Sequence, residues 1–556
     1  MVVSDLVSRI EELERRLAER DALLASLQDV NRSLEGRNAA LQSTLVNHAS
    51  EIELLKRKLF GPRSERGGTS ELQLTLADLL ADQQDLQREL DTLASGGASS
   101  DDPPDADKGK DGPTNRPKPK GRRDLSVSKL PHVILEFTDP HLAEKGRLIG
   151  FDESRQLIRQ PAAWKVLVKR VAKYEVAGND GPTVERVTPP VTLFPRAMLH
   201  TSAMAWLAVQ KFALGVPHHR LEKQLADEGV PLDRSTMCRA MEELGNVLGA
   251  TIMHAALQDA RTRCGVLSTD ATGAAIQPGP REGGPKRACK KGHFFTVVAD
   301  CDHVLFEYTA EHTSKVVANL FEGFGGYLQS DASSVYNILE RGPPNVDAPI
   351  TLVGCWAHCR RYFFEAAICK HRVGIVGLER VRAMYRLDES FGDCPPVERK
   401  RLRQQKLAPL VDDFFAWAKR ARRELTTRDL AARALGYAEN QEEELRRVLL
   451  DGRLPLDNNR SERALRRIVV GRTNWLFYGS DVHAEAAAAI FGVIASCRLH
   501  RIDPWSYLDE VLRALPYWPR DRYLELTPLH WATTRARLDP ADLAHPLPIV
   551  AVPPRV

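Results

Sequence analysis

The sequence predicts a multidomain protein of mixed α+β and α/β class, and three observations lead to this prediction. The chain has 556 residues, and domains usually hold about 100–200 residues, so several domains fit. Its hydrophobic fraction of 43% and charged fraction of 27% are those of a globular protein. Helical apolar periods alternate along the chain with short apolar runs of strand length, so both kinds of element are expected.

Charge, cysteine content and apolar runs exclude several classes of protein. The net charge of +4 is too small to indicate a nucleic-acid partner by itself. Nine cysteines in this length do not make a disulfide framework and are expected to be reduced thiols. The N-terminus has no apolar core of a signal peptide, and the run Ala486 to Ala495 is far shorter than the roughly 18 residues of a membrane span. We therefore expect a soluble, intracellular protein without a membrane partner.

Residues 1–94 are expected to form a coiled-coil region that pairs two copies of the chain. Alternating steps of four and three from Leu6 to Leu59 visit sixteen positions, and twelve of these are Leu or Ile. This 3.5-residue period creates an apolar seam that needs a partner helix, most simply that of a second copy. Asn31 and Asn38 fall on the seam, where a buried amide favours one register. A long helix docked on its own protein is the alternative.

Residues 95–124 are expected to be a flexible linker, because they are rich in Gly, Pro, Ser, Asp and Lys. The first part is acidic and the second part is basic. A basic, extended arm can lie along a phosphate backbone, and its cations include Lys118, Lys120, Arg122 and Arg123. A solvated spacer is the alternative for the same residues.

Residues 125–195 are expected to form a small β-rich module, with strand alternation clearest from Trp164 to Val176. Residues 196–255 are expected to be helical and to contain a helix-turn-helix. Its helices are predicted over 218–228 and 234–244, with Asp233 as N-cap of the second. The second helix would offer these residues to a DNA groove: Arg234, Ser235, Thr236 and Arg239. Helix pairs joined by a glycine turn are common, so a purely structural pair is the alternative.

Residues 256–500 contain a series of short apolar strands, two of which end in an aspartate. Three strands, a helix, a strand, a helix and a strand are expected, with the strands at 265–272, 293–300, 303–309, 326–333 and 350–355. This is the order of a ribonuclease H-like sheet, in which the first and fourth strands lie side by side. Asp270 and Asp331 end those two strands, so we expect their carboxylates to meet.

Two such carboxylates can hold two divalent ions about 3.5–4 Å apart, which activate a water or a 3′-hydroxyl and stabilise the leaving oxygen. We expect Mg²⁺ or Mn²⁺, because oxygen ligands suit these ions. Asp is also common where strands end, so Asp270 or Asp331 alone is a weak signal.

A third carboxylate is expected from a later helix, and Glu462 is the candidate. Asn459 stands three residues earlier at the helix start, so this pair could equally be an N-cap with a reciprocal acidic partner. Five arginines surround the single glutamate, which suits a metal ligand beside a phosphate backbone: Arg460, Arg463, Arg466, Arg467 and Arg472.

Cys355 and His358 follow the last strand. Cys and His can bind zinc, but a second pair at fitting spacing is missing, so no zinc is expected. We expect Cys355, His358 and Asn459 to support the acidic site, and His358 could also contact a phosphate.

Together these motifs resemble the bacterial DDE transposases of the insertion-sequence-66 family, over nearly the whole chain. The similar segments are 54–66, 149–166, 214–237, STDAT at Asp270, LQSDASSVYN at Asp331, CWAHCRRYF at 355–363, LDNNRSERALRRIVVGRTNWLFYGSD with Glu462, and DPWSYLDEVL at 503–512. The stretch that contains Glu462 is the most specific of them.

The resemblance implies that Asp270, Asp331 and Glu462 are the DDE triad, with two ions between them. Residues from about 364 to 453 look like the helical insertion that such transposases place before the third acid, and 501–556 form a C-terminal tail. The implied activity is metal-dependent strand cleavage and strand transfer at insertion-sequence ends. The implied partners are terminal inverted repeats, target DNA and accessory proteins encoded by the same element, in the bacterial cytosol.

Two features depart from the family pattern. The β-rich module has no cysteine where the family usually carries paired Cys-x-x-Cys motifs, so a zinc ion is not expected there. Ala271 follows Asp270 where the family often has an acid. Two other functions use the same residues: a ribonuclease H-like nuclease or resolvase without strand transfer, and a non-catalytic dimeric DNA-binding regulator derived from a transposase. The nuclease has no need of a long coiled coil, and the regulator would tolerate loss of the acids.

Overall fold

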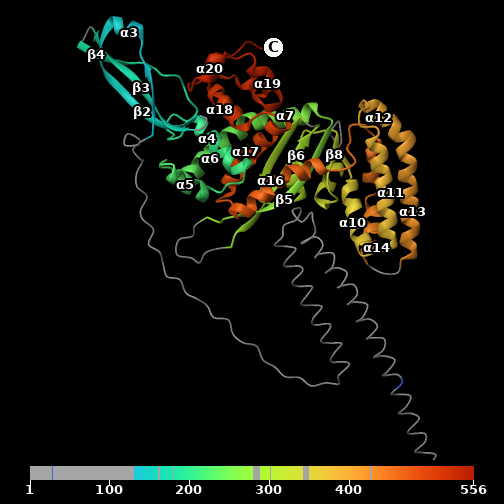
Figure 1. The fold of residues 1–556 in the computed structure, drawn as a ribbon. Helices are drawn as coiled ribbons and strands as arrows, with labels where there is room; N and C mark the ends of the chain where they lie inside the picture. Colours follow the sequence, from blue (N-terminus) through green and yellow to red (C-terminus); the bar gives the residue numbers. More distant parts are fainter. Residues whose placement is uncertain are drawn as a thin grey trace, which may run out of the picture. The chain divides into compact units, whose positions relative to one another are not determined.

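Figure 1 shows the fold in a computed structural model of the chain. The residues that it describes are 28, 130–160, 163–178, 181–279, 288–300, 302–341, 350–425 and 429–555. The predicted coiled coil (apart from the helical residue Gln28) and the predicted linker with its basic arm lie outside the described residues. Two compact units are distinguished: one contains the described residues of 361–379 and 420–436, and the other contains those of 117–360, 380–419 and 437–556.

A four-stranded sheet forms the module that the sequence predicted to be β-rich. Its elements are β1 (His132–Phe137), α3 (Pro140–Lys145), β2 (Gly146–Gln160), β3 (Ala163–Gly178) and β4 (Gly181–Arg186). β3 contains the predicted strand from Trp164 to Val176, and it pairs with each of the other three strands. Apolar side chains alternate with charged ones over parts of β3, which matches the period of a strand, and β2 pairs antiparallel with β3 from Gly146 to Gln160.

This module is fixed to the next helix by aromatic packing and backbone bonds, without a cysteine. The rings of Trp164 and Trp206 meet edge to face with centroids 5.2 Å apart. Trp206 belongs to α4 (Thr201–Ala208). The N–H of Leu157 donates to the carbonyl of Met198 at 2.7 Å, and the N–H of His200 donates to the carbonyl of Leu157 at 2.8 Å. Trp164 is buried and Trp206 is partly buried, so this edge-to-face contact helps to hold the module against α4.

A helical region follows, with both helices of the predicted helix-turn-helix. Its elements are α4, η2 (Val209–Ala213), α5 (His218–Asp227), α6 (Arg234–Leu248), η3 (Gly249–Met253) and α7 (His254–Arg263). The predicted N-cap is confirmed, since the Asp233 carboxylate accepts from the N–H of Thr236 at 2.8 Å. α6 is longer than predicted and continues through η3 into α7, and Gly245 and Gly249 lie within this continuous helical stretch.

The central sheet has the strand order β7-β6-β5-β8-β9. Its strands are β5 (Val266–Ile276), β6 (Lys290–Ala299), β7 (His303–Thr309), β8 (Tyr327–Gln329) and β9 (Thr351–Val353). β5, β6 and β7 pair antiparallel, whereas β8 pairs parallel to both β5 and β9. The expected neighbourhood of the first and fourth strands is therefore confirmed. Between the strands lie α8 (Ser314–Leu320), η4 (Ser334–Asn337) and α9 (Ile338–Arg341).

The prediction that the first strand ends at Asp270 is wrong. β5 runs on to Ile276, because residues beyond Asp270 keep their pairing with β6 as far as Lys290. Only the parallel pairing with β8 stops before Asp270, at Ser268 and Gln329. Asp270 therefore lies at the point where β5 leaves β8, in the middle of the strand.

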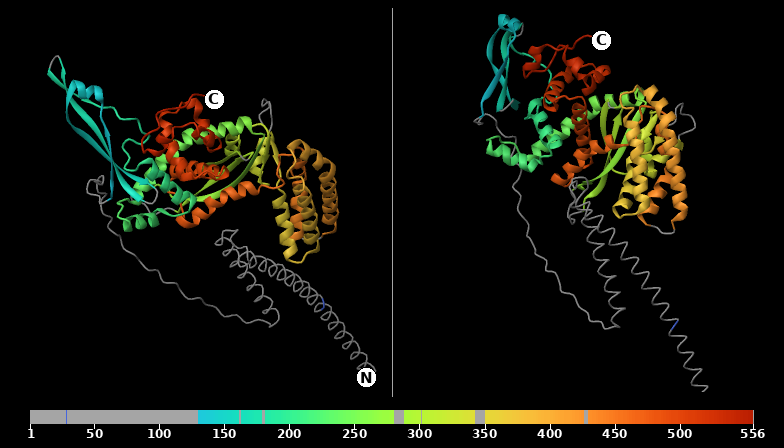
Figure 2. Two further views of the ribbon diagram at one scale, coloured as in Figure 1. Left: turned by 45° about the horizontal axis from the view of Figure 1, so that its top comes forward. Right: turned by 45° about the vertical axis from the view of Figure 1, so that its right-hand side comes forward.

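Two long helices pack on this sheet, α16 (Asn459–Trp475) on β5 and β6, and α17 (Asp481–Leu499) on β7 and α6 (Figure 2). α17 is the one described helix long and apolar enough to cross a membrane by length and composition. Its residues from Ala486 to Ile494 are buried inside the protein, which is the position of a core helix. Gly245 of α6 lets α17 approach closely, since a Cβ there would lie 2.3 Å from the carbonyl oxygen of Ala486.

The predicted helical insertion and the C-terminal tail consist of helices. The insertion contains α10 (Trp356–Ile368), α11 (Arg372–Glu389), α12 (Pro396–Leu402), η5 (Arg403–Leu407), α13 (Ala408–Glu424), α14 (Leu430–Asn440), α15 (Glu442–Arg446) and η6 (Arg447–Leu449). The tail contains α18 (Pro504–Ala514), η7 (Leu515–Tyr517), η8 (Arg520–Leu526), α19 (Pro528–Arg535) and α20 (Pro540–Ala544). The buried Arg403 donates to Asp388 at 2.6 Å and to the carbonyl of Leu454 at 2.7 Å, which fixes the chain just before α16.

Candidate active site

Strand register places Asp270 and Asp331 at the same level of two neighbouring strands. Ser268 of β5 pairs with Gln329 of β8, and each aspartate stands two residues beyond its member of that pair. Asp270 accepts a hydrogen bond from the N–H of Ala271 at 2.8 Å, and Asp331 accepts one from the N–H of Ser333 at 3.2 Å. Both side chains are partly exposed, so solvent and ligands can reach them.

Glu462 reaches the same region through Asn458, the residue just before α16. The side-chain amide of Asn458 donates to the carbonyl of Thr269 at 2.7 Å, directly before Asp270. The N–H of Asn458 donates to the sulfur of Cys355 at 3.2 Å, and its carbonyl accepts from the N–H of Glu462 at 3.3 Å. Asn458 is 0% exposed. Through its side chain and its backbone, this one residue therefore joins β5, the residue before α10 and the first turn of α16.

Of the three expected support residues, Cys355 and His358 lie at this junction, and Asn459 does not take the role expected of it. Asn459 is exposed, and its N–H donates to Asp457 at 3.2 Å. The N-cap is Asn458. Its side chain makes no capping bond, because it donates to the carbonyl of Thr269 in β5 instead. Two adjacent asparagines cannot be told apart from the sequence, because only the three-dimensional path of the chain decides which one faces inward.

His358 and Cys355 contribute in different ways. His358 Nε2 lies 3.6 Å from Glu462 Oε1, so the ring faces the third acid from α10. Burial raises the pKa of the Cys355 thiol to about 11. Cys355 is therefore a neutral thiol near pH 7. Its sulfur accepts the hydrogen bond from the N–H of Asn458.

Tyr336 is a site residue that the sequence did not reveal. The side chain is 1% exposed, and burial together with the charges of Asp331 and Asp270 raises its pKa. Both aspartates thus act electrostatically on one buried phenol, which stays neutral at physiological pH. A tyrosine five residues after Asp331 carries no motif of its own, so only the fold reveals its position.

The carboxylate oxygens of the three acids are suitable ligands for hard divalent cations. The three side chains do not surround one common position. Among the described residues no group of three His, Cys, Asp or Glu side chains could hold one ion. A two-ion arrangement needs fewer protein ligands for each ion, because Mg²⁺ keeps several waters. Asp270 on β5, Asp331 two residues after β8 and Glu462 in the first turn of α16 offer carboxylate oxygens of the kind that such ions bind.

The arginines of α16 divide into two groups. Arg467 donates to the carbonyl of Ala213 at 2.8 Å, and Arg472 donates to the carbonyl of Gly273 at 2.6 Å. These two hold the helix to η2 and β5, so the prediction that they face DNA is not supported by their positions. Arg463 and Arg466 are exposed. They remain candidates for contact with a phosphate backbone.

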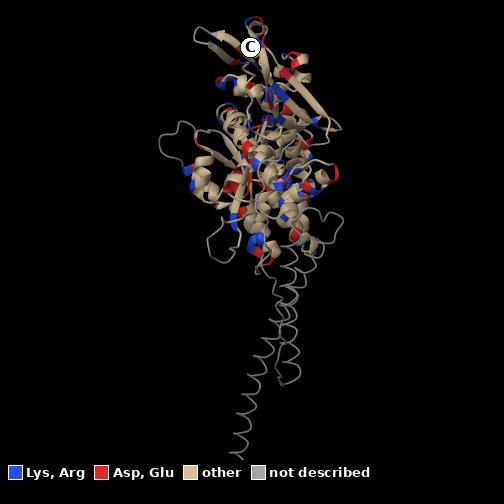
Figure 3. Ribbon diagram, turned by 90° about the vertical axis from the view of Figure 1, so that its left-hand side faces the viewer, with Lys and Arg blue, Asp and Glu red and all other residues tan. Residues whose placement is uncertain are grey.

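The predicted DNA-contact residues of α6 lie at its N-terminal end. Arg234, Ser235 and Arg239 are exposed and Thr236 is half-buried. The N–H of Arg234 donates to Glu222 of α5 at 3.1 Å, which fixes the angle between the two helices. In the view of Figure 3, basic and acidic residues are interspersed along the described ribbon.

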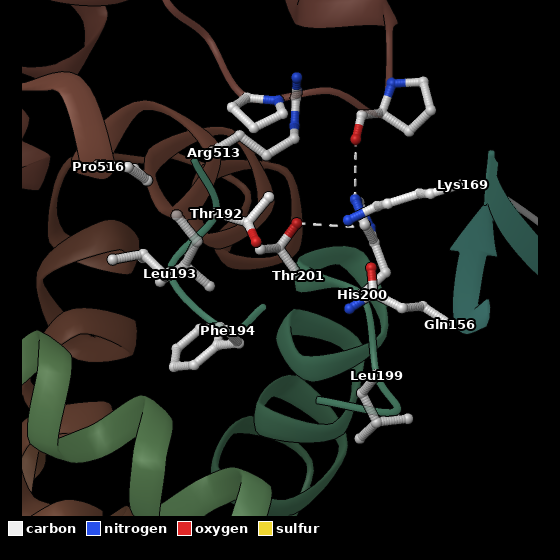
Figure 4. Close-up of a pocket in the computed structure, with 13 residues that line it drawn as sticks. Gln156, Lys169, Thr192, Leu193, Phe194, Leu199, His200, Thr201, Arg513 and Pro516 are labelled. Atoms are coloured by element: carbon white, nitrogen blue, oxygen red, sulfur yellow. Dashed lines mark hydrogen bonds between the residues drawn. The ribbon is translucent and has the colours of Figure 1, made fainter. Parts of the chain in front are cut away.

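A pocket outside the acidic site lies where β2, β3, α4 and the C-terminal tail meet (Figure 4). His200 fills one side of it. Its Nδ1 accepts from the N–H of Ser202 at 3.2 Å, so Nε2 carries the proton and donates to the carbonyl of Pro546 at 2.9 Å. Burial lowers the pKa of His200 to about 4, in keeping with a neutral ring. Arg513 donates to four tail carbonyls, so these polar groups hold the tail in place.

Comparisons with known proteins agree over most of the chain. Residues 196–486 match the model of the family "Transposase IS66 family", and 493–529 match "IS66 C-terminal element". Residues 49–134 match "Transposase C of IS166 homeodomain", across the end of the predicted coiled coil and the whole predicted linker.

Two curated relatives come from Sinorhizobium fredii (strain NBRC 101917 / NGR234). "Uncharacterized protein y4qI" is 28% identical over 537 residues, 93% of each chain. "Uncharacterized protein y4hP" is 28% identical over 521 residues, which covers 87% of this chain and 89% of that protein.

One solved structure, the "Drosophila P element transposase strand transfer complex", matches 53% of this chain and 92% of its own at 10% identity, with a TM-score of 0.30. A score this low supports no further conclusion. The family model, by contrast, covers residues 196–486, and with them β5, β8 and the start of α16, where the three acids stand. The chain belongs to the IS66 family of transposases.

Proposed function

We propose that the chain cuts DNA strands at insertion-sequence ends and transfers them to target DNA, in a reaction that depends on Mg²⁺ or Mn²⁺. The single observation that carries the proposal is the joining of the segments that bear the three acids, which come from distant parts of the sequence. Parallel pairing aligns Asp270 with Asp331, and Asn458 ties the turn that bears Glu462 to the residue before Asp270. The strand order β7-β6-β5-β8-β9 supports the expected ribonuclease H-like sheet.

The roles of the residues follow from their positions. Asp270 would share both ions, and Asp331 and Glu462 would each complete one. When bound, the ions would supply an activated water or 3′-hydroxyl and stabilise the leaving oxygen. His358, 3.6 Å from Glu462, would orient that carboxylate. Asn458 would hold the distance between helix and strand, and Tyr336 would remain a neutral phenol behind the two aspartates.

Substrate binding would involve other parts of the chain. Arg463 and Arg466 would contact the phosphate backbone, and the N-terminal end of α6 would read terminal-repeat DNA. The coiled coil predicted over 1–94 would pair two protomers, so that two transposon ends are held together. Accessory proteins of the same element would be additional partners, and the bacterial cytosol would be the site of action.

The test is a cleavage and strand-joining assay on labelled insertion-sequence ends with Mg²⁺, Mn²⁺ or EDTA. We expect nicked and joined products with either ion, none with EDTA, and none from Glu462→Gln in spite of unchanged end binding. Nicking without joining would favour the nuclease. Tight end binding without nicking in any metal would favour the regulator.

A further inference from the structure

The exposed side of α16 carries positive charge from Glu462 onward and no other acid. Between Glu462 and Asp481 the sequence contains four arginines and neither Asp nor Glu. Arg463 and Arg466 are exposed and stand three residues apart, which places them on one side of the helix, whereas Arg467 beside them donates to the carbonyl of Ala213. A phosphate backbone is the chemical partner that such a row attracts.

This row ends in an exposed apolar corner. Val470 on the same side of the helix is 57% exposed, and Leu476 and Phe477, which follow its last turn, are 68% and 44% exposed. Large apolar side chains are rarely left this open in adjacent positions unless they contact a partner. The corner is therefore unexplained by the packing of the described residues.

The backbone holds this corner firmly in place. Leu476 has a φ of 66°, a left-handed conformation that a leucine adopts only under constraint. Its N–H donates to the carbonyl of Arg472 at 2.9 Å. The N–H of Tyr478 donates to the carbonyl of Ala275 at 2.9 Å, and the N–H of Gln277 donates back to the carbonyl of Tyr478 at 2.8 Å. The corner is thus bonded to β5, the strand that bears Asp270.

We propose that Leu476 and Phe477 form an apolar wedge that inserts between bases of the DNA that lies along α16. Apolar side chains on DNA-binding proteins commonly insert in this way and unstack a base step. Fourteen residues separate Leu476 from Glu462, which corresponds to about 21 Å along the helix. For a duplex that runs parallel to α16, with 3.4 Å for each base step, the wedge would meet the DNA about six base steps from the cut site. This placement rests on the proposed role of Glu462.

A second copy of the chain is a less suitable occupant of the same surface. In a two-fold contact each copy would present the same row of arginines to the other, and like charges would face each other without an acid between them. DNA satisfies the arginines and the apolar corner together.

The test uses insertion-sequence-end duplexes with 2-aminopurine placed at successive positions around the sixth step from the cut. The full-length chain carries Glu462→Gln and is measured in EDTA, so the readout does not depend on cleavage. We expect a several-fold rise in fluorescence at one position, lost in Leu476→Ala and Phe477→Ala, together with about tenfold weaker end binding. Val397→Ala, which truncates an 83% exposed apolar residue of α12, serves as control and should change neither.

Because all three truncated residues are exposed, the variants should keep the melting temperature of the parent. An unchanged fluorescence rise in both corner variants would overturn the wedge. Loss of self-association in these variants with normal DNA binding would also overturn it and assign the corner to a second copy. Failure of the cleavage assay with a normal fluorescence response would count against the proposed chemistry alone.

Discussion

The side-chain amide of Asn458 donates to the carbonyl of Thr269 at 2.7 Å, across 189 positions of sequence. This bond ties the start of α16 to the residue before Asp270. Without it, the first turn of the helix would lose this hydrogen bond to β5. A buried amide that joins two segments proposed to carry catalytic acids should be sensitive to substitution, because small displacements of reacting groups reduce the reaction rate by large factors.

Replacement of Asn458 should therefore reduce catalysis more than binding. We expect Asn458→Ala to lower the strand-cleavage rate by roughly 10–100-fold, because a displacement of about 1 Å has an effect of this order. The half-saturating Mg²⁺ concentration should also rise, whereas simple loss of stability would leave it unchanged in the folded fraction. Cleavage rates across a Mg²⁺ titration measure both effects.

Asn459→Ala is the matched control, because Asn459 is exposed and lies next to Asn458. It should cleave at the rate of the unmodified chain. Equal losses in the two variants would show that the junction has no special role in placing Glu462.

The close contact between α6 and α17 predicts that alanine substitutions at two glycines will change the stability of the protein in opposite directions. A Cβ at Gly245 would lie 2.3 Å from the carbonyl oxygen of Ala486, whereas a Cβ at Gly436 in α14 meets nothing within 4 Å. Gly245→Ala should destabilise the protein by roughly 1–3 kcal/mol or more, as overpacking does. Gly436→Ala should stabilise it by about 0.5–1 kcal/mol. Chemical denaturation of both variants measures these changes, and equal shifts would contradict the packing.

Stability should fall between pH 6.5 and about pH 4 because of His200. Burial lowers its pKa to about 4 from 6.5, so in this window the unfolded chain binds a proton that the folded chain does not. The stability that the neutral ring contributes is present above pH 6.5 and is lost as the pH falls. At 1.36 kcal/mol for each pKa unit, the full effect is on the order of 3 kcal/mol.

Melting temperatures of the unmodified chain and of His200→Asn from pH 7.5 to pH 4.5 test this dependence. Asparagine can still cap α4 but does not titrate. The variant should therefore show a flatter profile. Parallel profiles would mean that His200 titrates normally or that other groups dominate.

The two groups of α16 arginines should respond differently to neutralisation. Arg463→Gln removes an exposed cation, so end binding should weaken and the slope of log affinity against log salt should fall by about 1. Arg472→Gln removes the bond to Gly273, so it should lower the melting temperature. Equal effects on the salt slope would mean that both residues contact phosphates.

Local sequence patterns were sufficient for much of the fold. The turn before Arg234 and the cap at Asp233 predicted α5 and α6, and alternating apolar residues predicted β3 and β7 within a few positions. The pairing of β5 with β8 also followed from the order of elements along the chain. These features depend on interactions within a few residues or on topological rules, which a single sequence carries.

The remaining features depend on contacts between distant residues. β5 continues past Asp270 because its partner β6 extends to Lys290, and nothing near Asp270 encodes that length. Asn458 rather than Asn459 faces inward because the chain before it is held by Arg403 from within the insertion. The outward arginine row was expected, but the sequence did not show that Arg467 and Arg472 bond to the protein instead.

The central claim is that Asp270, Asp331 and Glu462 act as ligands of the catalytic ions, and replacement of one oxygen ligand by sulfur tests it most directly. Asp331→Cys should lose strand cleavage in Mg²⁺, because Mg²⁺ disfavours thiolate, and should regain part of it in Mn²⁺, which accepts softer ligands. Asp331→Ala is the control and should stay inactive in both ions. Cleavage by Asp331→Cys in Mg²⁺ at the rate of the unmodified chain would contradict the account.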